Sequence, residues 1–362
     1  MLVIEMTNNQ QQIPAIRFNG FTDTWEQRKL EELAESFNYG LNASAMEFDG
    51  ENKYIRITDI DEQSHKFIQS GLTSPNIDLL NADDYLLKEG DILFARTGAS
   101  VGKSYQYEPL DGKVYFAGFL IRARIKPEFD PSFIFQNTLT EKYNNFIKVT
   151  SQRSGQPGVN AQEYANFSIL IPSRGEQVKL GNFFKQLDDT IALHQRKVTL
   201  LKRLKEAYLT RMLPQNSENI PLLRFADYFD PWEQRKFEDL AESFNYGLNA
   251  SAMEFDGENK YIRITDIDEY SHRFIQSGLT SPNTDLSNAN DYLLKEGDIL
   301  FARTGASVGK SYQYDPLDGK VYYAGFLIRA RIKPEFDSSF IFQNTLTEKY
   351  NNFIKITSQR SG

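Results

Sequence analysis

A glycine-rich stretch between two cations is the first candidate for chemistry in this sequence. Residues 98–104 read Gly-Ala-Ser-Val-Gly-Lys-Ser, close to a nucleotide-binding loop. That loop needs four residues between its glycines and a helix directly after it. Here three residues separate the glycines, and Tyr105–Tyr107 has the composition of a strand. We therefore predict no nucleotide hydrolysis. A turn of backbone amides beside Arg96 and Lys103 could hold one phosphate of DNA. The alternative is a plain hairpin loop.

Other catalytic centres lack the residues that they need. The chain has no cysteine, and its three histidines, at positions 65, 194 and 272, lie far apart in the sequence. This excludes thiol nucleophiles and cysteine-ligated metals, and it argues against a histidine metal site. Asp49–Lys53 has the residue types of a nuclease metal site, but such residues are common in exposed turns. No serine-nucleophile elbow and no dinucleotide-binding glycine motif is present. We predict a protein that is not an enzyme and that holds no metal or cofactor itself.

Cations mixed with small polar side chains remain as candidates for contacts to DNA. Residues 96–126 hold six cations against two acids, and residues 148–156 combine Lys and Arg with Ser, Thr and Gln. These residue types position phosphates and read base edges. The alternative is an ordinary polar surface. The candidates form two sets that an internal repeat relates to each other: Arg96, Thr97, Lys103, Ser104, Lys148, Gln152 and Arg153, and Arg303, Thr304, Lys310, Ser311, Lys355, Gln359 and Arg360.

The chain contains one long segment twice. Residues 13–155 recur as residues 220–362 at a constant offset of 207, and 125 of the 143 positions are identical. Solenoid units are only about 20–50 residues long, so this is a tandem duplication of a whole domain. Both copies should have the same fold and bind the same ligand, unless the duplication is recent and has no role. The second copy stops at Gly362, with nothing after it to match residues 156–213, so either the chain is naturally cut short and lacks the last strand and distal helix of its second domain, or the sequence is a fragment.

Helices and strands alternate along each copy, which predicts an α+β fold with β-rich, mixed domains. Apolar spacing predicts helices, and alternation or β-branched runs predict strands. In the first copy we expect helices at Trp25–Phe37 and Pro131–Lys148, a tight turn at Asp111-Gly112, and strands at Tyr54–Ile60, Asp91–Arg96, Ser104–Tyr107, Val114–Ile125 and Phe167–Pro172.

A heptad pattern follows the first copy. Its apolar positions alternate at spacings of four and three residues, which predicts one long helix that packs against another helix. At 1.5 Å per residue, a helix over residues 176–213 would be roughly 55–60 Å long. We favour a coiled-coil spacer over a core helix of one domain, and we interpret its histidine as a packing residue rather than a metal ligand. This helix-packing seam is Leu180, Phe184, Leu187, Ile191, His194, Val198 and Leu201.

These patterns divide the chain and bound its location. We predict an N-terminal tail at 1–12, domains at 13–173 and 220–362, the spacer helix at 174–213 and a linker at 214–219. The net charge of −8 and the pI of about 5.2 exclude DNA binding by bulk charge, so any contact must come from local patches or from partners. No signal peptide and no 18-residue apolar run is present, so we expect a cytoplasmic protein without a membrane partner.

The order of motifs over nearly the whole chain resembles the specificity subunit of type I restriction–modification systems. The residues that carry the resemblance are Trp25–Leu30, Tyr54–Ile60, Gly90–Gly98, Gly155–Asn160 and Ile169–Pro172, leading through Gln177 into the helix to Leu213. The resemblance implies a non-catalytic subunit with two target-recognition domains, each reading one half of a bipartite site in double-stranded DNA. It also implies methyltransferase subunits and restriction/translocase subunits as partners, and S-adenosylmethionine, ATP and magnesium are expected on those partners.

This sequence departs from the family in two respects. Members usually carry two different recognition domains, whereas these two are nearly identical, which predicts an inverted-repeat DNA site. The second spacer helix is missing, so we expect the seam of residues 176–213 either to pair with the same helix of a second chain or to make the protein poorly soluble. Two alternatives remain open. One is a silent or recombination-derived specificity cassette, and the other is a duplicated protein- or carbohydrate-binding module on a coiled-coil stalk.

Overall fold

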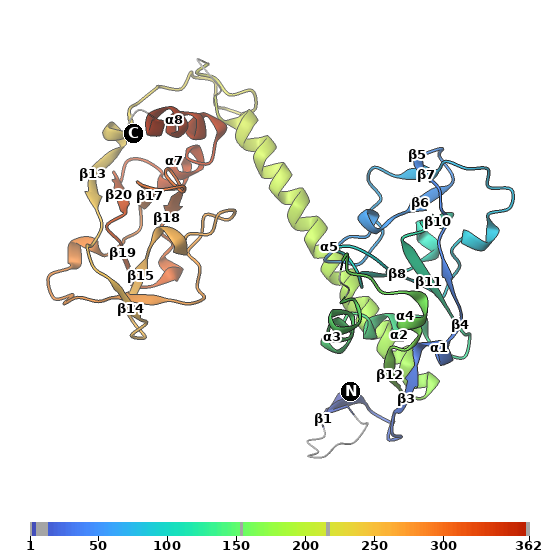
Figure 1. The fold of residues 1–362 in the computed structure, drawn as a ribbon. Coiled ribbons are helices and arrows are strands. Elements are labelled where there is room, and N and C mark those ends of the chain that lie inside the picture. The colour runs from blue at the N-terminus through green and yellow to red at the C-terminus, as the bar shows by residue number, and fades with distance from the viewer. Residues whose placement is uncertain (1, 5–13, 153–154, 215–217, 360–362) are drawn as a thin grey trace. The chain divides into compact units, whose positions relative to one another are not determined.

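The computed structural model describes residues 2–4, 14–152, 155–214 and 218–359. The chain divides into two compact units, Met1–Lys197 and Val198–Gly362 (Figure 1). Within the described residues, no helix combines the length and the apolar character that a bilayer crossing requires. The same residues contain no cluster of three or more His, Asp or Glu side chains able to hold a metal ion.

A four-stranded antiparallel sheet lies at the centre of the first unit. Its strand order is β4 (Ala34–Tyr39), β11 (Leu120–Ile125), β8 (Asp91–Ala95) and β9 (Ser104–Gln106). Successive side chains of a strand point to opposite faces. Ile92 and Phe94 of β8 therefore enter one core, while Leu93 and Ala95 enter another. Because both faces are covered, all five residues of β8 are buried.

Short elements cover the two faces of this sheet. The first core packs against the helices α1 (Leu30–Leu33), α2 (Pro131–Asn137), α3 (Glu141–Thr150) and α4 (Ala161–Ala165), and against the antiparallel pair β3 (Glu26–Lys29) and β12 (Ser168–Ile171). The second core packs against the parallel pair β6 (Lys53–Ile55) and β10 (Val114–Phe116). Two further antiparallel pairs complete the unit: β1 (Leu2–Ile4) with β2 (Ile16–Phe18), and β5 (Ala45–Glu47) with β7 (Thr73–Pro75).

The second unit repeats most of these elements at the sequence offset of 207. Its central sheet has the order β13 (Ala241–Tyr246), β20 (Leu327–Ile332), β17 (Asp298–Ala302) and β18 (Ser311–Gln313). The other elements are α6 (Phe237–Leu240), β14 (Ala252–Glu254), β15 (Lys260–Ile262), β16 (Thr280–Pro282), β19 (Val321–Tyr323), α7 (Ser338–Asn344) and α8 (Glu348–Gln359). Among its described residues, no strand pairs with Glu233–Lys236, the counterpart of β3.

Several predicted elements were wrong, and long-range pairing explains the largest of these errors. The expected helix Trp25–Phe37 is β3, one helical turn and β4, because its two ends pair with β12 and β11. The expected strand Val114–Ile125 is interrupted at Ala117–Phe119, and the expected helix Pro131–Lys148 is interrupted after Asn137. Tyr54–Ile60 is strand only at its start and continues as a 3₁₀ turn. The strands at β8, β9 and β12 and the turn at Asp111-Gly112 are confirmed.

The long helix is confirmed as α5 (Arg174–Met212), which passes through the boundary between the units. Leu180, at the start of the seam, packs against the first core. Farther along, Phe184, Leu187, Ile191, Val198 and Leu201 are between 41% and 53% exposed, and His194 is exposed too. The seam after Leu180 is therefore an unpartnered apolar stripe within the described residues.

Candidate nucleic-acid interface

The glycine-rich stretch is a hairpin loop between two strands of the central sheet. β8 ends at Ala95 and β9 begins at Ser104. Gly98 and Gly102 have φ angles of +80° and +88°, which favour glycine over other residues. Space also requires Gly102 to be glycine, because a Cβ there would lie 2.7 Å from the Ile147 side chain of α3. No helix follows the loop, as predicted, since Ser104 continues the sheet.

Four backbone amides of this loop are occupied inside the protein. The amides of Val101, Gly102 and Lys103 donate to carbonyls of the same hairpin at 2.9–3.1 Å. The amide of Gly98 donates to the Pro157 carbonyl at 3.1 Å. These four amides therefore cannot also hold a DNA phosphate, and the phosphate-binding turn stays a prediction for the amides of Ala99 and Ser100.

Arg96 is the cation of the loop that remains available. Its guanidinium lies 5.0 Å from the ring centre of Tyr39, and no carboxylate among the described residues forms an ion pair with it. Its backbone amide donates to the carbonyl of Phe119, whose side chain is 63% exposed. We call Arg96, Tyr39 and Phe119 the arginine–aromatic cluster of the first repeat.

The second repeat contains the same cluster. The Arg303 guanidinium lies 4.9 Å from the ring centre of Tyr246 and 5.8 Å from that of Phe326, which is 60% exposed. Planar guanidinium groups on aromatic faces keep their edge N–H groups free for bidentate hydrogen bonds. Sequence reasoning found both arginines and missed the aromatic residues. One sequence feature could have indicated Phe119, because the Gly118-Phe119 pair interrupts an otherwise continuous apolar segment, Val114–Ile125.

The segment after α3 brings several predicted residues to one edge of the first unit. The amide of Val159 donates to the Arg96 carbonyl at 2.9 Å, and Thr97 pairs with Gly158. The amide of Gly158 donates to the Ser151 carbonyl, next to the exposed Gln152.

Lys148 lies one turn earlier on α3 and is exposed, as Lys355 and Gln359 are on α8. Thr304 is exposed beside Arg303. The predicted Arg153 and Arg360 lie outside the described residues.

Ser104 and Ser311 are not available to DNA, so these two predictions are wrong. Both are fully buried, and their hydroxyls hydrogen-bond to the hydroxyls of Thr138 and Thr345 at 2.7 Å. They are buried because β9 and β18 are edge strands of the central sheet whose first residues face α2 and α7. Their role is to attach helix to sheet.

Lys103 and Lys310 point into their own units rather than toward solvent. The ammonium groups donate to the carbonyls of Ile60 and Ile267 at 3.1 and 3.2 Å, and Lys310 also pairs with Glu269 at 2.7 Å. A phosphate contact would require these bonds to break, so the geometry does not support the predicted role of either lysine.

Two further cations of the 96–126 stretch are internal. Arg124 donates from Nε and one terminal nitrogen to the buried Asp91 carboxylate, both at 2.8 Å, and this hydrogen bonding raises the pKa of Arg124. Arg122 is 4% exposed, lies 4.0 Å from the same carboxylate, and its burial lowers its pKa. The same arrangement joins Asp298 to Arg329 and Arg331. These arginines connect neighbouring strands of the sheet through ion pairs with a buried carboxylate.

The acidic stretch Asp49–Lys53 is a turn, in agreement with its simpler interpretation. One oxygen of Asp49 accepts from the amides of Glu51 and Asn52, and the other accepts from the Asn52 side chain, at 2.7–2.8 Å. Hydrogen bonds from Asn52 and Glu51 lower the pKa of Asp49 to about 2. The carboxylate oxygens hold the turn together, and no other acid joins them in a metal site within the described residues.

Comparisons with known proteins are consistent with this architecture. A family model described as "Type I restriction modification DNA specificity domain" matches residues 22–203. The chain is 19% identical over 251 residues to the type I restriction enzyme MjaVIII specificity subunit of Methanocaldococcus jannaschii, an alignment that covers 68% of this chain and 57% of that relative. The S subunit of a type I restriction–modification system from M. genitalium has a similar solved fold. Its TM-score is 0.62 at 13% identity, covering 97% of this chain and 83% of that one.

Proposed function

This chain belongs to the type I restriction–modification DNA specificity family, and we propose that it reads double-stranded DNA without catalysing a reaction. The observation that carries the proposal is the family match together with one exposed arginine–aromatic cluster in each repeat. A guanidinium held over a tyrosine ring is preorganised to donate two hydrogen bonds to a guanine edge. The neighbouring exposed Phe119 and Phe326 supply apolar contact area.

The two repeats are proposed to read identical half-sites. Their 125 identical positions include every member of the arginine–aromatic cluster. Two equal recognition domains that face a duplex in opposite senses select an inverted repeat with a spacer that is not read. One exposed cation of each of α3 and α8, Lys148 and Lys355, is proposed to contact a phosphate, a contact that positions a protein on DNA without selecting a sequence.

The partners follow from the same proposal. The chain would hold modification (methyltransferase) subunits and restriction/translocase subunits of a type I system at the DNA site. S-adenosylmethionine, ATP and magnesium would be bound by those subunits. The proposal agrees with the acidic net charge of −8, because the assembled complex rather than this chain alone would surround the DNA.

The exposed seam of α5 is proposed to pair with the same seam of a second copy. Five apolar side chains between Phe184 and Leu201 are 41–53% exposed at coiled-coil spacing. Burying such a stripe against an identical one is favourable, because each buried CH₂ group contributes about 0.8 kcal/mol.

A methylation map tests the proposed function. DNA from cells that express this chain with its methyltransferase subunits would be sequenced at single-base resolution for methylated bases. We expect a bipartite motif whose two halves are inverted copies of each other. A motif with unrelated halves would contradict equal recognition by the two repeats. The absence of any motif beyond that of cells without this chain, with the chain present and folded, would contradict the specificity role.

A further inference from the structure

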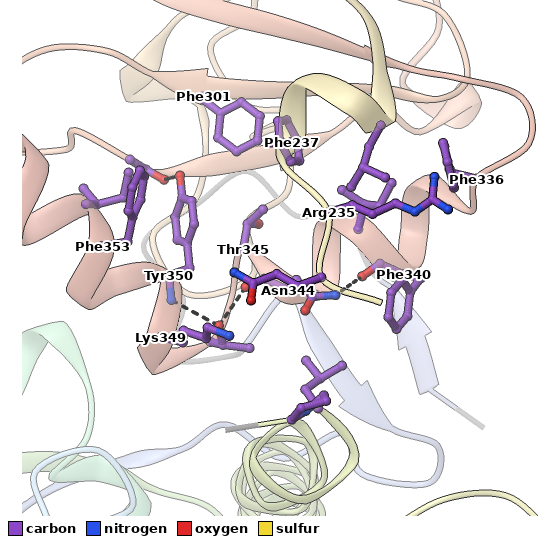
Figure 2. Close-up of a pocket in the computed structure, with 18 of the residues that line it drawn as sticks. Arg235, Phe237, Phe301, Phe336, Phe340, Asn344, Thr345, Lys349, Tyr350 and Phe353 are labelled. Carbon is purple, nitrogen blue, oxygen red and sulfur yellow. Dashed lines mark hydrogen bonds between the residues drawn. The ribbon is translucent and has the colours of Figure 1, made fainter. Parts of the chain in front are cut away.

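The second repeat has an open apolar groove on one face of its central sheet. The groove encloses about 1050 Å³. Figure 2 shows aromatic side chains from several elements around it, among them Phe237, Phe301, Phe340, Tyr350 and Phe353. Phe340 is 47% exposed and Phe353 is 60% exposed. Large apolar side chains that line a shared hollow usually mark a binding surface.

The same surface is covered in the first repeat. Of the 24 groove residues that belong to the repeat, 23 are identical in the first copy, and Phe237 replaces Leu30 as the single change. Yet Phe133, the counterpart of Phe340, is only 4% exposed. The difference comes from residues 157–181, which follow the first repeat and cover this face of its sheet.

Aromatic and strand contacts fix residues 157–181 on the first repeat. Tyr164 stacks on Phe94 at 4.7 Å and donates to the Ala95 carbonyl at 2.7 Å. Phe167 contacts the rings of Tyr143 and Phe146 at 5.2 and 5.0 Å. β12 then pairs with β3 along four residues.

A glycine completes this docking where helix and helix meet. Gly181 of α5 approaches α2 so closely that a Cβ would lie 2.9 Å from the Phe133 amide and 2.4 Å from the Asp130 carboxylate. The docked segment therefore has a recognisable pattern: a tyrosine on a helical turn, a phenylalanine, an alternating apolar strand, and a glycine near the start of a helix.

The walls of the groove in the second repeat keep the geometry of the covered site. Trp232 and Phe340 pack edge-to-face with ring centres 5.4 Å apart, and Trp25 and Phe133 do so at 5.8 Å. The Tyr350 hydroxyl donates to the Gly309 carbonyl at 2.8 Å, as its counterpart Tyr143 does to Gly102. A preformed groove loses little conformational entropy when it binds.

We propose that this groove binds a polypeptide segment with the pattern of residues 157–181, which adds a strand to Glu233–Lys236. The tyrosine of the segment would stack on Phe301, and its phenylalanine would lie between Tyr350 and Phe353. Its strand would run antiparallel to Glu233–Lys236 in the register that joins Leu170 to Gln27 in the first repeat. Strand addition of this kind combines main-chain hydrogen bonds with side-chain pockets.

A labelled peptide tests the proposal with the full 362-residue chain and without DNA, so its outcome is independent of the proposed DNA function. The probe is a synthetic peptide of residues 157–181 carrying a fluorophore, titrated by anisotropy. We expect one saturable site per chain. The variant Phe340→Ser should weaken binding by at least tenfold, whereas Leu317→Ser should leave it unchanged. Leu317 is 91% exposed in the same repeat and lies outside the groove.

Disulfide trapping tests the register. The chain has no cysteine, so a single Gln234→Cys substitution gives one reactive site. Under oxidising conditions it should cross-link to a peptide with cysteine in place of Leu170, and much less to a peptide with cysteine in place of Ser168. Hydrogen exchange should show new protection of the Gly305 amide, because its counterpart Gly98 donates to Pro157.

Two outcomes would overturn the proposal. One is the absence of saturable peptide binding to a folded chain, shown by an unchanged circular dichroism spectrum. The other is self-association of the chain that Phe340→Ser abolishes, combined with a peptide that neither binds the chain nor competes with this self-association. That result would mean that the groove binds a different surface of a second copy.

Discussion

At the scale of single residues, exposure and partners separate the arginines that face solvent from those that hold the sheet together. Arg96 directly follows β8 and Arg122 lies in the neighbouring strand β11, but Arg96 rests on an aromatic ring at the surface and Arg122 is 4% exposed. Composition alone places both in one positive stretch. Strand alternation and the pairing of β8 with β11 decide which one reaches solvent, and neither can be read from a count of charges.

The arginine–aromatic clusters give a first prediction. In a complex of this chain with its methyltransferase subunits, the double variant Arg96→Ala/Arg303→Ala should lose discrimination at one base pair of each half-site, by about 1–3 kcal/mol. The double variant Lys148→Ala/Lys355→Ala should weaken binding to all sequences about equally and reduce its salt dependence. Selection of bound duplexes from a random library, repeated at two salt concentrations, measures both effects.

The control is Lys113→Ala/Lys320→Ala, which removes two exposed lysines that form ion pairs with Glu51 and Glu258. A uniform loss for the arginine variant would contradict base reading.

The buried carboxylate of Asp91 gives a second prediction. It is fully buried and hydrogen-bonded to Arg124, with Arg122 at 4.0 Å. Asp91→Asn leaves two arginines near a neutral amide, so the free energy of unfolding of the first unit should fall by about 3–5 kcal/mol. Urea unfolding followed by circular dichroism measures the change. Glu89→Gln, in the exposed turn just before β8, is the matched control and should change stability by less than about 0.5 kcal/mol. Equal stability of both variants would show that the ion pairs contribute nothing.

At the scale of elements, the sequence predicts best where a pattern is long or local. The spacer helix extends from Arg174 to Met212, close to the predicted 174–213, because its heptads continue without Pro or interior strand pairing. Trp25–Phe37 shows the opposite case. Its spacing of Leu30, Leu33 and Phe37 fits a helix, but pairing with β12, about 140 residues away in sequence, overrides that local preference.

The seam of α5 gives a third prediction. Ile191→Lys places a charge in the middle of the proposed helix pair and should shift the chain from dimer to monomer, since a buried unpaired ammonium is strongly unfavourable. Leu193→Lys makes the same change two residues away and off the seam, and it should leave the dimer intact. Leu193 is 65% exposed, so its substitution removes no packing within the chain. Multi-angle light scattering over a range of concentrations distinguishes the two. A wild-type chain that is monomeric at high concentration would contradict pairing through the seam.

At the scale of the whole molecule, two nearly identical sequences occupy different environments. The sequence predicts one fold for both repeats, and from α1 and α6 onward their elements agree in order, with α8 two residues longer than α3. It does not predict that Phe133 is 4% exposed while Phe340 is 47% exposed, because that difference depends on residues 157–181, which lie outside the repeat. The candidate site is likewise only partly predictable from the sequence. The residue types and spacing indicate Arg96 and Arg303, but the rings beneath them, Tyr39 and Tyr246, belong to strands that are distant in the sequence.

Unequal cores give a fourth prediction, that the second unit unfolds first. Burying a large apolar side chain adds about 1.5–3 kcal/mol to the free energy of unfolding. Several residues that line the groove are buried only in the first repeat. The chain has two tryptophans, Trp25 and Trp232, one in each repeat. Trp25→Phe leaves fluorescence that reports the second unit, and Trp232→Phe leaves fluorescence that reports the first. In urea, the midpoint seen by Trp232 should be the lower one. Coincident midpoints would mean that the groove has no effect on stability.

The pairing of β3 with β12 also makes the order of synthesis important. Ribosomes add about 5–20 residues per second, so roughly 7–28 s separate the appearance of Glu26–Lys29 from that of its partner strand Ser168–Ile171. Throughout that interval the nascent chain carries an unpaired strand edge and an uncovered apolar face, the kind of surface that molecular chaperones bind. The identical tetrapeptide Glu233–Lys236 is made about 60 residues after β12, some 3–12 s later. The first repeat thus has several seconds to bind the segment before the identical tetrapeptide of the second repeat exists, so the order of synthesis favours closure of the first copy.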